Sequence, residues 1–176
     1  MISPLSIASN TGASWHTRPE TSADIATIRE ITLQAFGRQF EVDYLDALRA
    51  HPGAGIPGLS SVATTPEGEV VAYALLTRAH IGDTPVLSLS PVAVLPSYQN
   101  QGAGSAVVRF ALDTARERGH QTVLVLGHEN YYPRFGFRQA TEFGIHHPEH
   151  DGPNLMALAL NGNPLPTGDI TYPINA

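Results

Sequence analysis

The chain has 176 residues, of which 42% are hydrophobic, and this length supports one substantial core but not two ordinary domains. Its formal net charge of −6, with 10 basic against 16 acidic side chains, argues against a nucleic-acid partner, because phosphates are neutralised by clustered cations. The absence of cysteine excludes disulfides, thiolate metal sites and a cysteine nucleophile.

The first third of the sequence is predicted to hold a loose arm, a strand and two helices. Residues 1–13 are small and polar and are interpreted as the arm, with 14–176 forming a single domain. Trp15–Pro19 is predicted as a short strand. Ser22 is predicted as the N-cap of a helix whose apolar face carries Ile25, Ile28, Ile31 and Ala35. A second helix is predicted over Asp43–Ala50, where a Pro-Gly pair follows.

The middle of the chain alternates between strand and helix patterns. Strands are predicted at Leu59–Thr64, Glu69–His80 and Val86–Leu95, the first two forming a hairpin. Gly102–Gly119 follows as an amphipathic helix, and Thr122–Leu126 as a buried strand because its run is continuously apolar. This order predicts a right-handed βαβ unit with parallel strands.

Shorter elements are expected after residue 126. They are a helical turn at Asn130–Phe135, a strand from Gly136, a strand at Leu155–Leu160 and a short strand at Ile170–Tyr172. No apolar run approaches the roughly 20 residues needed to span a bilayer, and the start of the chain does not resemble a secretory signal. We therefore expect a cytoplasmic location and no membrane partner.

The most informative segment is the glycine-containing loop at 99–104, between a predicted strand and an amphipathic helix. A helix N-terminus offers unpaired N–H groups and the positive end of the helix dipole, and glycines allow close approach of a ligand. Two nucleotide-binding motifs are excluded by the sequence: a P-loop needs a lysine, which the chain lacks, and G-x-G-x-x-G fails at Val107. The flanking elements favour phosphate binding over an empty strand-to-helix turn.

Two segments carry a resemblance to a known family. Val92–Gly104 resembles motif A of the GNAT N-acetyltransferases, whose signature is [QR]-x-x-G-x-[GA] after a strand, and Tyr131–Phe137 resembles their motif B. The likeness extends from Trp15 to about Leu160, and the wording of both motifs is similar to that of a subgroup of small bacterial members of undefined substrate. The resemblance implies an α/β fold with a central mixed sheet, splayed middle strands and flanking helices.

The resemblance also implies a binding site for acetyl-CoA between the Val86–Leu95 and Thr122–Leu126 strands. The residues expected to contact acetyl-CoA are Val92, Ala93, Val94, Gln99, Asn100, Gln101, Gly102, Ala103, Gly104, Ser105, Tyr131 and Phe135. Their backbone amides are expected to bind the pyrophosphate and the pantetheine arm.

Three catalytic roles are implied by the same alignment. The backbone N–H of Val92 would stabilise the oxyanion, and Tyr132 would protonate the leaving thiolate. Pro91 independently favours a bulge or unpaired edge here, since proline cannot donate to a sheet ladder; a proline that only blocks mispairing is the alternative. Ser88 stands where some relatives have a glutamate base, so its expected role is to position a water.

The general base is left open between several residues. Ser90 is a second candidate for orienting a water. His128 and Glu129, after the Thr122–Leu126 strand, are alternatives, although each is more readily interpreted as a loop residue outside the site, and His80 is a more remote candidate. No base is assigned from the sequence.

Two further segments are interpreted conservatively. His146–Asp151 contains metal-ligand residue types, but their spacing matches no metal motif, so a solvated loop and no metal site are expected. Phe40 and Glu41 lie where relatives form part of the acceptor pocket and could line it, but surface packing is the preferred interpretation.

The sequence thus predicts an acyl-CoA-dependent N-acyltransferase that moves acetyl from acetyl-CoA to a primary amine on a small molecule or a peptide N-terminus. The alternative is an acetyl-CoA-binding sensor or regulatory module with little turnover. Another acyl group, the identity of the amine and assembly into a homodimer are left open.

Overall fold

The computed structural model describes residues 14–174, so the arm expected at 1–13 lies outside the described residues. The helices are α2 (Ile25–Phe36), α3 (Gln39–Ala50) and α4 (Ala103–Glu117), with 3-10 turns η2 (Ser22–Asp24), η3 (Pro96–Tyr98), η4 (Tyr132–Phe135) and η5 (Ala140–Phe143). The strands are β1 (His16–Pro19), β2 (Ser61–Thr64), β3 (Val70–Ile81), β4 (Thr84–Val94), β5 (Thr122–Leu126), β6 (Arg138–Gln139), β7 (Ile145–His146), β8 (Leu155–Ala159) and β9 (Gly168–Thr171). Within 14–174, no helix combines the length and apolar character required to cross a membrane.

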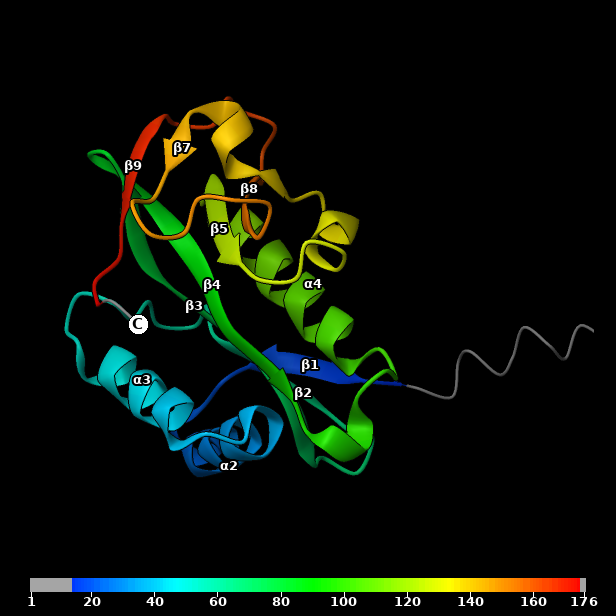
Figure 1. The fold of residues 1–176 in the computed structure, drawn as a ribbon. Helices are drawn as coiled ribbons and strands as arrows, with labels where there is room; N and C mark the ends of the chain where they lie inside the picture. Colours follow the sequence, from blue (N-terminus) through cyan, green and yellow to red (C-terminus); the bar gives the residue numbers. More distant parts are fainter. Residues whose placement is uncertain (1–13, 175–176) are drawn as a thin grey trace, which may run out of the picture.

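The strands form a mixed sheet with the order β1-β2-β3-β4-β5-β8-β6 (Figure 1). Every neighbouring pair along this path is antiparallel except β4 and β5, which are parallel. β9 adds to the far end of β3, where His80 pairs with Thr171, and it also pairs with β7. The predicted α/β fold with a mixed sheet is confirmed, and so is the parallel pairing of the strands on either side of α4.

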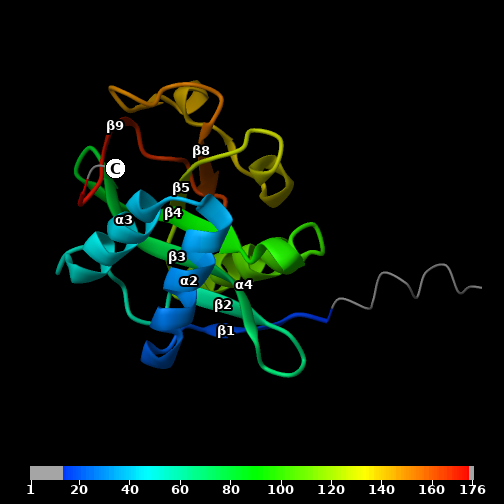
Figure 2. The ribbon, with the colours of Figure 1, turned by 60° about the horizontal axis from the view of Figure 1, so that its bottom comes forward.

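The helices cover both faces of the sheet, as Figures 1 and 2 show. α4 packs on one face through Val107, Val108, Ala111, Leu112 and Ala115, which share a core cluster with Ala63, Ala72 and Leu87. α2 and α3 pack on the other face, where Ile28, Ile31 and Leu45 meet Val62, Tyr73 and Leu75. Because neighbouring strand residues point to opposite faces, β2 and the first eight residues of β3 are buried on both faces, whereas Arg78 and His80 near the end of β3 are exposed.

The parallel pair β4–β5 is short and then opens. Only two register pairs join the strands, Leu87 with Val123 and Ser88 with Leu124, although β4 continues to Val94. Figure 1 shows the two strands diverging beyond this point. The splayed middle strands expected from the sequence are therefore present.

A register shift lies at the same place on the other edge of β4. Ala74 of β3 pairs with Val92, but Leu76 pairs with Leu89, so β4 carries one extra residue in this stretch. The extra residue falls at Ser90–Pro91, whose peptide bond is cis. Of the alternatives left open for Pro91 from the sequence, the structure shows the bulge.

Two predictions for the N-terminal helices were wrong in detail. Ser22 is not an N-cap: it lies in the 3-10 turn η2, and Thr21 and Asp24 form a capping box in front of α2. α3 begins at Gln39, four residues before the predicted start. Its first turn is stabilised by polar side-chain pairs, such as Gln39 donating to Asp43 at 3.0 Å, which an apolar periodicity does not reveal.

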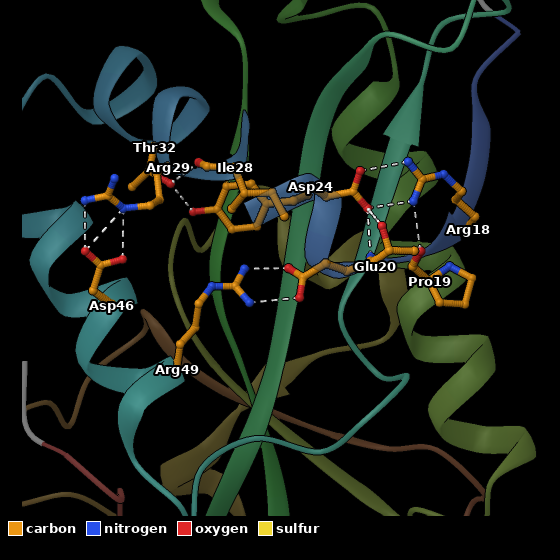
Figure 3. Close-up of polar contacts among 11 residues, drawn as sticks. Arg18, Pro19, Glu20, Asp24, Ile28, Arg29, Thr32, Asp46 and Arg49 are labelled. Carbon is orange, nitrogen blue, oxygen red and sulfur yellow. Dashed lines mark hydrogen bonds and ion pairs between the residues drawn. The ribbon is translucent and has the colours of Figure 1, made fainter. Parts of the chain in front are cut away.

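Ion pairs fix α2 and α3 to the edge of the sheet (Figure 3). Arg49 of α3 makes a two-pronged contact with Glu20, which follows β1, and both side chains are mostly buried. Arg29 of α2 binds Asp46 of α3 at 3.0 Å. These contacts matter for the site described below because both helices supply one of its walls.

Candidate active site

The glycine loop gives α4 an open N-terminus. Asn100 and Gly102 both have a positive φ, of 61° and 91°, and these bend the chain into the helix. The first i to i−4 hydrogen bond of α4 runs from the Ala106 N–H to the Gly102 carbonyl. The N–H groups of residues 103–105 therefore have no partner within the helix and point out of its positive end.

Side chains hold this loop in place. The Trp15 indole Nε1 donates to the carbonyl of Gln101 at 2.9 Å, which ties the loop to the start of β1. The Gln101 amide in turn donates to the Ser97 carbonyl at 3.2 Å. The Gln99 amide donates to the Val94 carbonyl at 3.1 Å, so the loop is also fixed to the end of β4.

A cavity of about 590 Å³, here called the loop cavity, lies in front of the glycine loop. Nine of the residues predicted to contact acetyl-CoA line it: Val92, Ala93, Val94, Gln99, Asn100, Gly102, Gly104, Ser105 and Tyr131. The hydroxyls of Ser105 and Tyr131 are 3.0 Å apart and share a hydrogen bond. A Cβ at Gly104 would come within 3.2 Å of the Val94 side chain, so glycine keeps this wall open.

Three predicted contact residues have side chains elsewhere. Gln101 is engaged with Ser97, as described, and Ala103 is 1% exposed within the core under α4. Phe135 packs against Tyr131 and lies beneath the guanidinium of Arg109, 5.0 Å from its ring centroid. These three residues do not line the loop cavity.

Five lining residues were not predicted as contacts with acetyl-CoA: Ala35, Phe36, His128, Tyr132 and Arg134; of these, Tyr132 was predicted as the general acid and His128 was a candidate base. Arg134 lies over the Tyr131 ring, 4.2 Å from its centroid, and its Nε donates to the Tyr131 carbonyl at 2.9 Å. It is the one arginine among residues 14–174 that lines this cavity. The sequence shows that Arg134 belongs to the Tyr131–Phe137 motif, but it does not show that the Arg134 side chain lies against the loop cavity.

The open edge of β4 faces the loop cavity. Leu95 N–H donates to the Val71 carbonyl of β3, at 2.8 Å. Backbone groups alternate between the two edges of a strand, so those of Val92 and Val94 point the other way, into the gap beside β5. β4 therefore presents peptide groups that have no strand partner beside the glycine loop, although the Val94 carbonyl accepts the Gln99 side-chain amide.

A second cavity, of about 430 Å³, adjoins the first and is here called the aromatic cavity. Five aromatic side chains line it: Phe36, Phe40, Tyr44, Tyr132 and Tyr172. Its floor is the stretch Ser88–Val92 of β4, and Leu126–His128 closes one side. Phe40 and Glu41 both line this cavity, which favours the pocket alternative over the surface packing that was preferred from the sequence.

The two cavities meet at four shared residues, Phe36, Val92, His128 and Tyr132. A molecule bound at the glycine loop and a second molecule bound in the aromatic cavity would meet at these four residues. Of these four, Tyr132 and His128 are the ones able to exchange a proton through the side chain.

Tyr132 is a protonated phenol at neutral pH. It is 8% exposed, and its ring packs edge-on against Tyr131 and Phe137 at centroid distances of 5.0 and 5.9 Å. Burial, and to a lesser degree the neighbouring Tyr131, raises the pKa of Tyr132 to about 12. Burial acts in this direction because it disfavours the phenolate.

The structure separates the candidates for a base. Ser88 is 7% exposed and lines the aromatic cavity, as does Ser90. His128 is exposed and lines both cavities. Glu129 lines neither, and His80 is on the β3–β9 pair, away from both.

The segment His146–Asp151 is more ordered and closer to the site than the expected solvated loop. His147 is 8% exposed, its N–H donates to Asp151 at 2.7 Å, and its ring stacks on His150 at 4.5 Å. His147, Glu149 and His150 line the aromatic cavity. Over the described part of the chain, no three or more His, Asp or Glu side chains gather so as to hold a metal ion.

A glycine loop at a helix start, beside a splayed parallel strand pair, defines the class of acyl-CoA-dependent acyltransferases implied by the sequence motifs. Residues 25–137 match the model of the acetyltransferase (GNAT) family, and the chain belongs to this family. The chain is 41% identical over 119 residues to the uncharacterized N-acetyltransferase YjhQ of Escherichia coli K12, an alignment that covers 65% of either chain.

Two solved structures are similar over most of the chain. One is the E. coli GNAT family N-acetyltransferase YhbS in complex with CoA: 25% identity, TM-score 0.78, covering 90% of this chain and 89% of that one. The other is a GNAT family acetyltransferase from Brucella melitensis in complex with acetyl-CoA: 31% identity, TM-score 0.73, covering 90% and 96%. Family members of this shape therefore bind CoA or acetyl-CoA.

Proposed function

We propose that this protein transfers the acetyl group of acetyl-CoA to a primary amine, with acetyl-CoA in the loop cavity and the amine in the aromatic cavity. The observation that carries the proposal is the junction of the two cavities at Val92, His128 and Tyr132. A donor and an acceptor entering from opposite sides would meet at groups suited to acyl transfer.

The loop cavity suits acetyl-CoA in three respects. The free N–H groups of residues 103–105 and the dipole of α4 favour a diphosphate, and Arg134 adds a positive charge at the rim. The open edge at Val92 and Val94 suits the peptide-like amides of a pantetheine arm, which can pair with it as an extra strand. Together these contacts would bring the thioester to the junction.

The chemistry we infer has three steps. His128 removes a proton from the incoming ammonium, with Ser88 orienting the amine or a bridging water. The freed amine attacks the thioester carbon, and the resulting oxyanion accepts a hydrogen bond from Val92 N–H. The intermediate then loses the CoA thiolate, which receives the proton of Tyr132. The second proton of the attacking nitrogen passes to the Tyr132 phenolate, which leaves a neutral amide and restores the phenol, while the exposed His128 releases its proton to solvent. The burial that raises the pKa of Tyr132 also penalises a bare thiolate, so proton donation lowers the cost of its departure.

The test is release of free CoA thiol from acetyl-CoA in the presence of a panel of primary amines, with mass spectrometry of the acylated product. We expect thiol release that depends on the amine and a product heavier by one acetyl group. Thermal stabilisation by acetyl-CoA with no turnover on any amine would instead indicate a sensor. A preference for propionyl- or succinyl-CoA over acetyl-CoA would revise the acyl group.

A further inference from the structure

The outer wall of the aromatic cavity differs in chemistry from the junction. It is built by three segments that are far apart in sequence: α3, the loop after β7 and the chain after β9. Glu41 and Tyr44 come from α3, Glu149 from the loop, and Tyr172 from the last segment. This wall faces whatever part of the acceptor lies beyond its reacting nitrogen.

The formal charges on this wall are negative. Glu41 and Glu149 supply two carboxylates, while no arginine of residues 14–174 lines the cavity and the sequence has no lysine. Arg38 pairs with Glu41 through Oε1, but the Arg38 side chain is 68% exposed and outside the cavity. The charge of Glu41 is therefore shared with a surface cation.

The titratable groups around these carboxylates are aromatic. Burial raises the pKa of Tyr44, with a smaller contribution from Glu41, and raises that of Tyr172 to about 12, with a smaller contribution from Tyr44. Both are neutral phenols at physiological pH, and the faces of such rings attract cations. His147 and His150 complete the wall, and His147 Nδ1 accepts a hydrogen bond from Glu149 N–H at 3.1 Å.

We infer that the acceptor is an aliphatic amine with a second positive charge, held by Glu41 and Glu149 between the tyrosine rings. The inference rests on the proposed acetyl transfer and adds the substrate class to it. A diamine would place one nitrogen at the junction beside Tyr132 and leave the other at the acidic wall. A carboxylate at the same position would meet like charge.

The test compares three amines of equal carbon-chain length: 1,4-diaminobutane, 1-aminobutane and 4-aminobutanoate. We expect kcat/KM for the diamine to exceed that for the monoamine by about tenfold after correction for its two equivalent nitrogens, with 4-aminobutanoate the poorest. The preference should shrink as salt is raised, because the contacts are partly exposed. A monoamine used as well as the diamine would overturn the inference.

Single substitutions test whether the preference for the diamine depends on the two carboxylates. Glu149→Gln and Glu41→Gln should each lower the diamine-to-monoamine ratio of kcat/KM about fivefold. Glu142→Gln is the matched control, since it removes the same charge from an exposed residue outside the cavity. Equal loss with both amines, or the same shift in the control, would contradict the assignment.

The outcome of this test can be separated from that of the proposed function. If acetyl-CoA is never consumed, the proposed transfer is wrong. Calorimetric binding of the three amines to the protein then still tests whether the acidic wall binds a second positive charge. Tighter binding of the diamine that is lost in Glu149→Gln would support the cation site; equal binding of diamine and monoamine would refute it.

Discussion

Gly127 and Tyr132 are in such close contact that position 127 has no room for a side chain. A Cβ built there would lie 2.5 Å from Cε2 of the Tyr132 ring and 3.1 Å from Cδ2. Gly127 directly follows β5, where its N–H donates to the Asn154 carbonyl at 2.9 Å. The end of β5 thus fixes the phenol at the junction of the two cavities.

Gly127→Ala should therefore displace Tyr132 and lower kcat by about 10- to 100-fold, since small displacements of a catalytic group are costly. Acetyl-CoA affinity should change much less. Gly55→Ala is the control, because nothing lies within 4 Å of a Cβ at that position. Steady-state kinetics with calorimetric acetyl-CoA binding would check both; an unchanged kcat in Gly127→Ala would contradict the role given to this contact.

Tyr132→Phe should reduce turnover by about 100-fold or more with little change in acetyl-CoA affinity. Because its pKa is raised to about 12, the Tyr132 phenol stays protonated beyond pH 10, so its ionisation should cause no loss of activity below that pH. An absorbance titration should show one late-ionising tyrosine fewer in the variant. Wild-type activity in Tyr132→Phe would remove the acid assignment.

His128→Ala should slow the reaction at neutral pH, where the amine arrives protonated, by about 10- to 100-fold. The deficit should narrow as pH rises towards the pKa of the amine, because less of the substrate then needs a base. Glu129→Ala is the neighbouring control, since Glu129 lines neither cavity. A deficit that stays constant with pH would mean that His128 acts otherwise.

Gly102→Glu should abolish acetyl-CoA binding, because it puts a carboxylate where the diphosphate is expected and forces a side chain onto a residue with φ of 91°. Gly119→Glu is the matched control. It adds the same charge at the other end of α4, where φ is +86° and no atom lies within 4 Å of an added Cβ. Isothermal calorimetry should show binding lost in the first variant and kept in the second. Retained binding in Gly102→Glu would contradict the assignment of the loop.

Asp24→Asn should lower the free energy of unfolding at pH 7 by about 2 kcal/mol, because it leaves the Arg18 contact and the capping box without their carboxylate. The Arg18 hydrogen bonds lower the pKa of Asp24 to about 2 from 3.8. Its contribution to stability is therefore present above pH 3.8 and is lost as pH falls towards 2.

Urea unfolding between pH 7 and pH 2 would check this, since the two proteins should converge in stability at the acid end. Asp113→Asn, which breaks an exposed i,i+3 pair with Arg116, should cost under about 0.5 kcal/mol. A constant difference between wild type and Asp24→Asn at every pH would contradict the linkage.

The elements with a strong local pattern were predictable from the sequence. The bounds of β5 match the prediction at both ends because its run is continuously apolar, and α4 begins one residue after the predicted glycine. Pro91 marked the bulge because proline cannot donate to a ladder. The two-residue strand β7 and its pairing with β9 were not foreseen, since long-range pairing leaves no local periodicity.

The two cavities of the candidate site also differ in how far the sequence predicts their lining residues. The glycine loop is contiguous in sequence, so its motif identified most of the residues that line the loop cavity. The aromatic cavity was mostly missed, because His147, Glu149 and Tyr172 reach it only through the pairing of β9 with β3 and β7. Phe135 packs against the core and does not line the loop cavity, so its contact with acetyl-CoA stays a prediction; an aromatic residue in a motif can pack into the core as readily as it can contact a ligand.

The part of the chain that resembles the family model ends at residue 137, before His147, Glu149, His150 and Tyr172. If the acceptor binds in the aromatic cavity as proposed, substitutions after residue 137 could change which amine is accepted without altering the glycine loop. Relatives that share the glycine loop need not share an acceptor, and sequence comparisons meant to group them by substrate should weigh residues 138–174 above the motif.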